Sequence, residues 1–428
     1  MASRLMQRLL GNQLLTNMSW LGMAQFLTRI SRLLSTIVVA RILTPEHYGL
    51  AAIVLVVNEF AHVFARAGTA SRIVQATEKE LSTIANTAYY LNWGIGGTLF
   101  VVQCLIAFPM ALWYDNDALI LPVCVLALSY LMLPTAMVHA ALNIRANKLN
   151  VVARSEVRQA IGDGVLTVLF ALAGFGMWAL VLPKVLVIPL WIMTHRKAVT
   201  WKAPSRPTFS AAGDILTYTK RVLGVDLLGA FRANIDYILV GYFLGVTSLG
   251  IYYFAYNAGL GITRGLINGM NNALFPYLCA TDDKEQLKKR FRFGLKALAL
   301  SMCPLILAQA ALAPIYVPWV FGARWVEDGA VPILMLVCLS GIPIAFSEAG
   351  SQFLRAIGRP QDDLQWHCLF TLVFVSAIGL GLSFGIVGVA AAVLLVQVFM
   401  VPVYYFIQIK PKIDAEVFSE DDVVYKGV

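Results

Sequence analysis

The stretches that decide the fold are ARILTPEHYGLAAI at residues 40–53 and GYFLGVTSLGIYYF at residues 241–254. Each begins at the end of an apolar segment, passes through a tight turn to a glycine, and continues into the next apolar segment. The two glycines, Gly49 and Gly250, hold equivalent places. The same helical hairpin therefore occurs once at the start of each half of the chain, which predicts an internal repeat.

The composition of the 428 residues around these turns excludes a soluble protein. Apolar residues make up 59% of the chain and charged residues only 13%, whereas an ordinary soluble domain has about 25% charged residues. The same figures exclude a disordered chain. A membrane-spanning helix needs about 20 residues and a short loop. The length therefore allows roughly a dozen spans.

Twelve apolar segments, separated by polar stretches or by Gly and Pro, are predicted to span the membrane. They are residues 17–42, 49–74, 84–112, 119–143, 157–175, 177–195, 214–244, 249–277, 294–320, 330–354, 365–385 and 387–409. We therefore expect an all-α integral membrane protein with about 12 transmembrane helices. The N-terminal residues indicate a short amphipathic helix rather than a cleaved signal peptide.

A long basic connection, residues 196–213, divides the segments into two sets of six. It predicts a six-helix bundle at 1–200, a cytoplasmic linker at 201–213, a second bundle at 214–410 and a cytoplasmic tail at 411–428. Six is an even number, so both bundles begin on the same side of the membrane. A pseudo-twofold axis along the membrane normal would then relate them.

The distribution of basic residues predicts the orientation of the chain. Of the 33 Lys and Arg, 24 fall in alternate connections and at the termini, while the other connections hold only Arg41 and Arg324. Cytoplasmic loops are rich in Lys and Arg, so both termini are expected in the cytoplasm. This bias also explains most of the net charge of +9, and nucleic-acid binding is not expected.

Seven basic residues remain inside predicted helices, where a charge costs at least ~2.5–3.5 kcal/mol. They are Arg29, Arg32, Arg66, Arg72, Lys184, Arg232 and Arg264. Arg72 could extend to the inner interface. The other six are predicted to line one basic cavity between the bundles, because arginine binds phosphate and carboxylate groups through two parallel hydrogen bonds. The predicted ligand is anionic, with phosphate favoured.

Five acids lie in or near the same helices, and two interpretations of them stay open. They are Glu59, Asp163, Asp226, Asp236 and Glu348. The first interpretation pairs Glu59 with Arg29 or Arg32, Asp236 with Arg232, and Asp163 with Lys184. The second makes Glu59, His62, Asp236 or Asp163 the site of a coupling ion or proton.

Gly261, Gly265 and Gly269 recur at four-residue spacing. They are predicted to let another helix pack closely, or to let their own helix bend. The sequence has no nucleotide-binding loop of the GxxxxGK[ST] type and no paired-cysteine metal site. We therefore expect no catalytic residue, no metal and no cofactor.

Three motifs resemble those of polysaccharide (Wzx-type) flippases of the multidrug/oligosaccharidyl-lipid/polysaccharide exporter superfamily. They are AR-x-LTPE-x-YG at 40–49, NIDYILVGYFLG-x-x-x-LGIYYFAY at 234–256, and RAIGRPQ at 355–361. The resemblance covers essentially the whole chain. It implies two bundles that rock around a cationic lumen, in the bacterial inner membrane.

The resemblance also implies a substrate and partners. The substrate would be an oligosaccharide on undecaprenyl diphosphate, moved from the cytoplasmic to the outer leaflet with coupling to a proton or sodium gradient. Partners could include membrane lipids and the polymerase and chain-length regulator of the same pathway. The only site feature that the resemblance implies for particular residues is a set of arginines that line the lumen. In this sequence they would be Arg29, Arg32, Arg66, Arg232 and Arg264.

Three alternatives remain. A drug/cation antiporter of the same superfamily needs an acidic lumen, which the excess of bases opposes. A cell-wall lipid-precursor flippase usually has two further helices. A membrane scaffold without transport would leave the buried arginines without a purpose.

Overall fold

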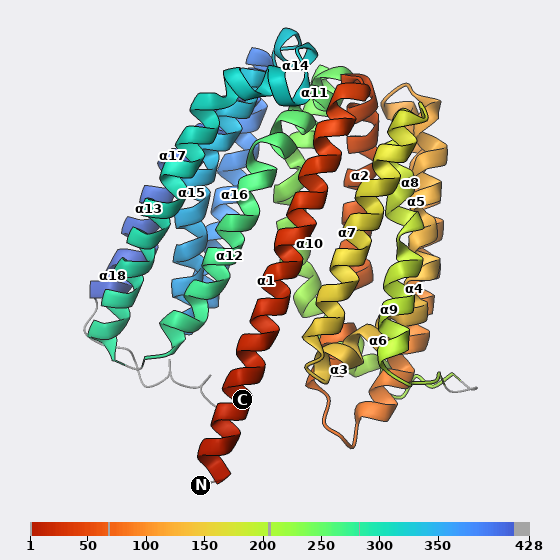
Figure 1. Ribbon diagram of the computed structural model, residues 1–428, viewed down its shortest axis with the longest axis vertical. Helices are drawn as coiled ribbons and strands as arrows, with labels where there is room; N and C mark the ends of the chain where they lie inside the picture. The colour runs from red at the N-terminus through yellow and green to blue at the C-terminus, as the bar shows by residue number, and fades with distance from the viewer. Residues whose placement is uncertain (1, 67–68, 204–206, 282, 415–428) are drawn as a thin grey trace. The chain divides into compact units, whose positions relative to one another are not determined.

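The computed structural model describes residues 2–66, 69–203, 207–281 and 283–414 (Figure 1). Within these ranges the chain consists of helices joined by turns and short loops, and it contains no strand. The all-α fold is therefore confirmed. Of the predicted tail, the part after Asp414 lies outside the described residues.

The chain forms two compact units, residues 1–234 and residues 235–428. The helices of the first unit are α1 (Ala2–Ile42), α2 (Pro45–Arg66), α3 (Thr69–Gln75), α4 (Leu81–Trp113), η1 (Asp117–Leu119), α5 (Ile120–Met132), α6 (Pro134–Arg145), α7 (Leu149–Leu172), α8 (Trp178–Leu186) and α9 (Ile188–Ala198). The next helix, α10 (Ala212–Leu244), begins in the first unit and ends in the second.

The second unit contains the end of α10 and the remaining helices. They are α11 (Val246–Ala258), α12 (Leu260–Cys279), α13 (Lys284–Tyr316), η2 (Val317–Phe321), α14 (Arg324–Glu327), α15 (Ala330–Ala356), α16 (Pro360–Gly381), η3 (Leu382–Phe384), α17 (Gly385–Tyr404), η4 (Tyr405–Ile409) and α18 (Lys410–Asp414). Each of the twelve predicted segments coincides with one helix or with successive helices.

Among the described residues, eight helical segments are long and apolar enough to cross a membrane, or nine if a bent pair counts as one span. The bent pair is 117–132 with 134–145, which meet at 54°. Pro134 stands at the start of α6, where a proline ring prevents a straight continuation of the preceding helix. The single helix predicted at 119–143 is therefore broken.

The boundary between the units lies inside α10 rather than in the predicted linker 201–213. The first part of α10 is tied to α3, because Arg72 pairs with Asp214 at 2.7 Å and Gln75 donates to Tyr218 Oη at 3.2 Å. These contacts place the start of α10 with the first unit.

The short helix α3 ends where an arginine from α6 binds its last carbonyl groups. Arg145 donates to the carbonyl oxygens of Val74 (3.0 Å) and Ala76, and it pairs with Glu78 at 2.7 Å. A cation at a helix C-terminus satisfies carbonyl groups that have no partner within the helix. Arg145 thus fixes the predicted cytoplasmic end of this unit.

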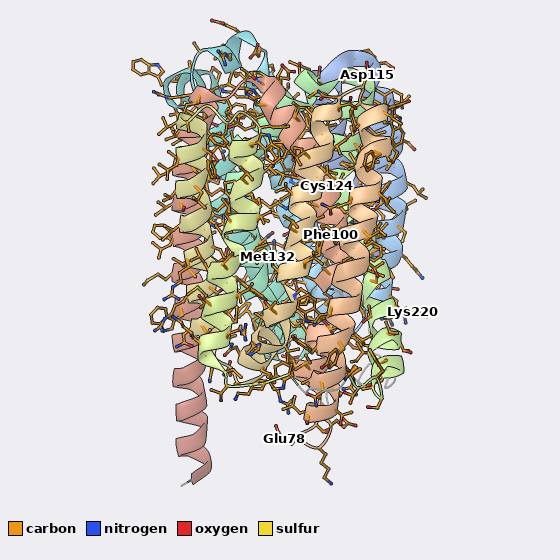
Figure 2. All side chains as sticks on the ribbon, turned by 90° about the vertical axis from the view of Figure 1, so that its right-hand side faces the viewer. Glu78, Phe100, Asp115, Cys124, Met132 and Lys220 are labelled. Atoms are coloured by element: carbon orange, nitrogen blue, oxygen red, sulfur yellow. The ribbon has the colours of Figure 1, made fainter. Side chains whose placement is uncertain are left out.

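The surfaces of both units carry many exposed apolar side chains. Leu112 and Trp319 are 82% and 80% exposed, which a membrane protein tolerates because lipid replaces water around it. In Figure 2, Glu78 and Asp115 lie toward opposite ends of the first unit, and Cys124 lies between them. This separation of charged ends from an apolar middle is typical of membrane-spanning helices.

Candidate functional site

The predicted arginines of α1 lie on a helix that packs along α7. Ser31 Oγ donates to the carbonyl oxygen of Ala160 at 2.9 Å, which fixes the face of α1 that contacts α7. Arg29 is half-buried and Arg32 is exposed. Within the described residues Arg32 makes no ion pair.

The acid in α2 pairs with a different base from the one expected. Glu59 Oε1 lies 3.8 Å from Arg66 Nη2, one helical repeat of seven residues along the same helix. The prediction that Glu59 pairs with Arg29 or Arg32 is therefore wrong, because a base on its own helix is within reach. Both side chains are more than half exposed, at 51% for Glu59 and 69% for Arg66.

The other polar residues of α2 face α5. The Tyr130 hydroxyl donates to Asn58 at 2.9 Å, and the Tyr130 ring lies edge-on to His62, with 5.5 Å between the ring centroids. His62 Nδ1 is buried and has no hydrogen-bond partner among the described residues. The polar stripe of α2 thus divides into an exposed ion pair and a half-buried group against Tyr130.

Asp163 of α7 and Lys184 of α8 form the ion pair that the sequence predicted. Lys184 Nζ lies 2.8 Å and 2.7 Å from the two carboxylate oxygens. The lysine is therefore neutralised by a contact between two helices of its own unit. This geometry favours a structural role for the pair.

Asp236 is buried in α10, and its carboxylate is not paired with Arg232. It accepts hydrogen bonds from the Tyr252 hydroxyl (2.9 Å) and from the backbone N–H of Tyr237 (2.9 Å). The predicted pairing is wrong because the carboxylate is bound by a phenol that α11 supplies, Tyr252. Arg232 is half-buried on the first-unit part of α10.

Arg264 of α12 also binds a tyrosine of α11. Its Nη1 donates to the Tyr256 hydroxyl at 2.9 Å. Within the described residues it makes no direct ion pair with a carboxylate. Tyr237 contacts both tyrosines, with its ring centroid 5.8 Å from that of Tyr252 and 5.5 Å from that of Tyr256.

Amides connect this group to α15. Asn271 Nδ2 donates to Glu348 Oε2 at 3.3 Å, and Asn268, with its amide oriented to satisfy both neighbours, donates to the same oxygen at 3.3 Å. Asn268 also donates to the carbonyl oxygen of Arg264 at 3.1 Å. We call the whole group the C-terminal polar cluster: Asp236, Tyr237, Tyr252, Tyr256, Arg264, Asn268, Asn271 and Glu348.

The C-terminal polar cluster can bind an anion and hydroxyl groups together. Arg264 supplies a fork of N–H donors for phosphate or carboxylate. Tyrosine rings and asparagine amides bind the faces and hydroxyl groups of sugars through apolar contact and hydrogen bonds. The sequence pattern pointed to Arg264 and Asp236 but not to the tyrosines. The signal was present as tyrosines at positions 252 and 256, which are four apart and share one helix face.

The glycine run of α12 does not pack closely within its unit. Gly261 and Gly269 are exposed, and a Cβ atom built at Gly269 would meet no atom within 4 Å. The break in this segment lies at Gly259, between α11 and α12. A Cβ there would lie 2.9 Å from both the Ala255 carbonyl oxygen and Cys338 Sγ, so only glycine fits.

No group of three or more His, Cys, Asp or Glu side chains that could hold a metal ion occurs in the part of the chain that the structure describes.

Comparisons with known proteins agree with this architecture. The family described as "Polysaccharide biosynthesis protein" matches residues 38–330. The chain is 24% identical over 383 residues to the lipopolysaccharide biosynthesis protein WzxC of Escherichia coli strain K12, covering 87% of this chain and 76% of that protein.

Two solved structures share the fold. A multidrug resistance MATE family transporter superposes with a TM-score of 0.73 at 17% identity, over 89% of this chain and 93% of its own. The lipid II flippase MurJ superposes with a TM-score of 0.74 at 12% identity, over 90% of this chain and 86% of its own. The family model matches most of the chain, and these findings show that the protein belongs to the polysaccharide biosynthesis protein family and has the fold of these transporters.

Proposed function

We propose that this transporter moves oligosaccharide repeat units, linked to undecaprenyl diphosphate, from the cytoplasmic to the outer leaflet by alternating access. The product would supply O-antigen, capsule or exopolysaccharide synthesis. The observation that carries the proposal is Arg264, a cation bound to a phenol instead of a carboxylate within the C-terminal polar cluster. A guanidinium that makes no direct ion pair has donors available for an anionic ligand.

The other basic residues differ in whether they have a carboxylate partner, and this difference suggests different roles. Arg66 and Lys184 have carboxylate partners, Glu59 and Asp163, so we assign them mainly to structure. Arg29, Arg32 and Arg232 remain proposed contacts for the diphosphate or for acidic sugars, together with Arg264.

We propose Asp236 as the site of the coupling proton or sodium ion. Glu59 and Asp163 each already bind a cationic side chain. Asp236 is held by neutral donors alone, so a proton or a sodium ion could neutralise it. His62, against Tyr130, is the second candidate.

The membrane potential favours outward movement of such a substrate. Moving one charge across 100 mV is worth about 2.3 kcal/mol. We place the protein in the bacterial inner membrane with both termini in the cytoplasm. The free energy of a substrate with net negative charge then falls as it moves outward. The polymerase and chain-length regulator of the pathway are proposed partners on the outer side.

A drug/cation antiporter and a cell-wall lipid-precursor flippase are the alternative functions. Arg264, which makes no direct ion pair with a carboxylate within the described residues, opposes a cationic substrate because like charges repel. The cell-wall precursor also carries a diphosphate, so charge does not separate it from the proposed substrate. The two substrates are distinguished only by the identity of the lipid that accumulates.

The test uses a deletion strain that carries the wild-type gene, Arg264→Ala or Arg29→Ala at matched protein levels. We expect loss of surface polysaccharide and accumulation of the lipid-linked repeat unit on the inner leaflet in both variants. Unchanged export in both would contradict the proposal. Accumulation of the cell-wall precursor instead would assign the second alternative.

A further inference from the structure

A groove of about 190 Å³ runs between α1 and α7 in the first unit. Figure 1 shows these two helices alongside each other. One wall is formed by Trp20, Met23 and Leu27 of α1, and the other contains Val157 of α7. The α1 side chains are exposed, Met23 at 60%. A groove this small holds part of a ligand rather than a whole drug-sized molecule.

Two arginines of α7 border this apolar groove. Arg154 and Arg158 are four residues apart and share one helix face. The Arg154 guanidinium lies over the Trp20 ring, 5.4 Å from its centroid, and Arg158 Nη1 donates to Thr194 Oγ1 at 3.1 Å. Neither has a carboxylate ion pair within the described residues.

The nearest acid on the same helix is engaged elsewhere. Glu156 accepts a hydrogen bond from Gln25 Nε2 at 3.1 Å. This contact holds its carboxylate against α1. The groove therefore combines two unneutralised cations with an apolar wall.

The contacts between the helices also give their direction. Three of them follow the same order along both helices: Trp20 with Arg154, Gln25 with Glu156, and Ser31 with Ala160. The helices are thus parallel. The arginines lie beside the part of α1 that is predicted to be nearest the cytoplasm, and Leu27 lies about 10 Å farther along α1 than Trp20. A charged end and an apolar continuation match the two ends of a lipid.

We propose that this groove binds an anionic glycerophospholipid of the cytoplasmic leaflet. The headgroup phosphate accepts hydrogen bonds from Arg154 and Arg158. One acyl chain lies over Trp20, Met23 and Leu27. Basic pockets between membrane helices on the cytoplasmic side recognise lipid headgroups in this way.

The test measures lipid binding by native mass spectrometry of the full-length protein in detergent, with phosphatidylglycerol or phosphatidylcholine added. We expect phosphatidylglycerol to bind more tightly. The double variant Arg154→Gln/Arg158→Gln should lose roughly thirtyfold in affinity, which corresponds to about 1 kcal/mol for each cation. The control Arg196→Gln/Lys197→Gln removes the same charge from α9, outside the groove.

Three results would overturn the proposal. They are equal affinity for the two lipids, equal loss in the control, and displacement of phosphatidylglycerol by an equimolar polyprenyl diphosphate, which would assign the groove to the transport substrate. If the double variant aggregates, Leu27→Gln tests the apolar wall instead and should weaken the same lipid. Since the measurement involves no transport, failure of the proposed function would not affect it.

Discussion

The membrane charges that the sequence singled out have different partners in the two units. In the unit of residues 1–234, Glu59 pairs with Arg66 and Asp163 pairs with Lys184. In the unit of residues 235–428, Arg264 binds the Tyr256 hydroxyl and Asp236 accepts from the Tyr252 hydroxyl. An ion pair neutralises both of its members, whereas a phenol positions a charged group and leaves its charge in place. The proposed function gives the first set a structural role and the second set a ligand-binding role.

The sharpest test of this difference is Arg264→Ala. Export of lipid-linked oligosaccharide should fall roughly 10- to 100-fold, because a charged hydrogen bond is worth about 1.5–3 kcal/mol. Arg264→Lys should keep part of the activity, since the charge remains but the planar fork is lost. The measurement is export in vesicles at matched protein levels.

The matched control is Arg66→Ala, which removes the same side chain from an ion pair in the other unit. Its export should stay within about threefold of wild type, below 1 kcal/mol. Equal losses of export in Arg264→Ala and Arg66→Ala would contradict the proposed difference between the units.

Tyr252→Phe tests the tyrosine side of the comparison. Removal of the hydroxyl leaves the buried Asp236 carboxylate without its side-chain donor, which should cost about 1–3 kcal/mol of stability. The measurement is thermal unfolding in detergent. Tyr277→Phe, at an exposed tyrosine of α12, is the control and should unfold at the wild-type temperature.

The sequence was sufficient to predict where the helices lie, but not which residues bind their charged side chains. Length and hydropathy predicted the segments because each spanning helix must satisfy its backbone groups internally. Asp163 and Lys184 were paired correctly. Asp236 was not, because its partner Tyr252 is polar only at the end of an apolar ring, and hydropathy gives it no weight. Which residue lies opposite another across two helices depends on packing.

Lys184→Met tests a smaller effect in the first unit. Asp163 would lose its partner while its side chain stays only 26% exposed. We expect a loss of about 1 kcal/mol in stability, because the pair is partly exposed and solvent screens it. Adding Asp163→Asn should recover part of this loss, which a double-mutant cycle measures. Independent effects of the two changes would contradict the pairing.

Glu59→Gln is expected to have the smallest effect. Glu59 and Arg66 are 3.8 Å apart and more than half exposed, and such pairs contribute about 0.2–1 kcal/mol. Unfolding should therefore change by a few tenths of a kcal/mol, and less at high salt. Export distinguishes the two roles left for Glu59. If it falls while stability is unchanged, the carboxylate takes part in transport, and the first unit then contributes a functional charge despite its ion pair.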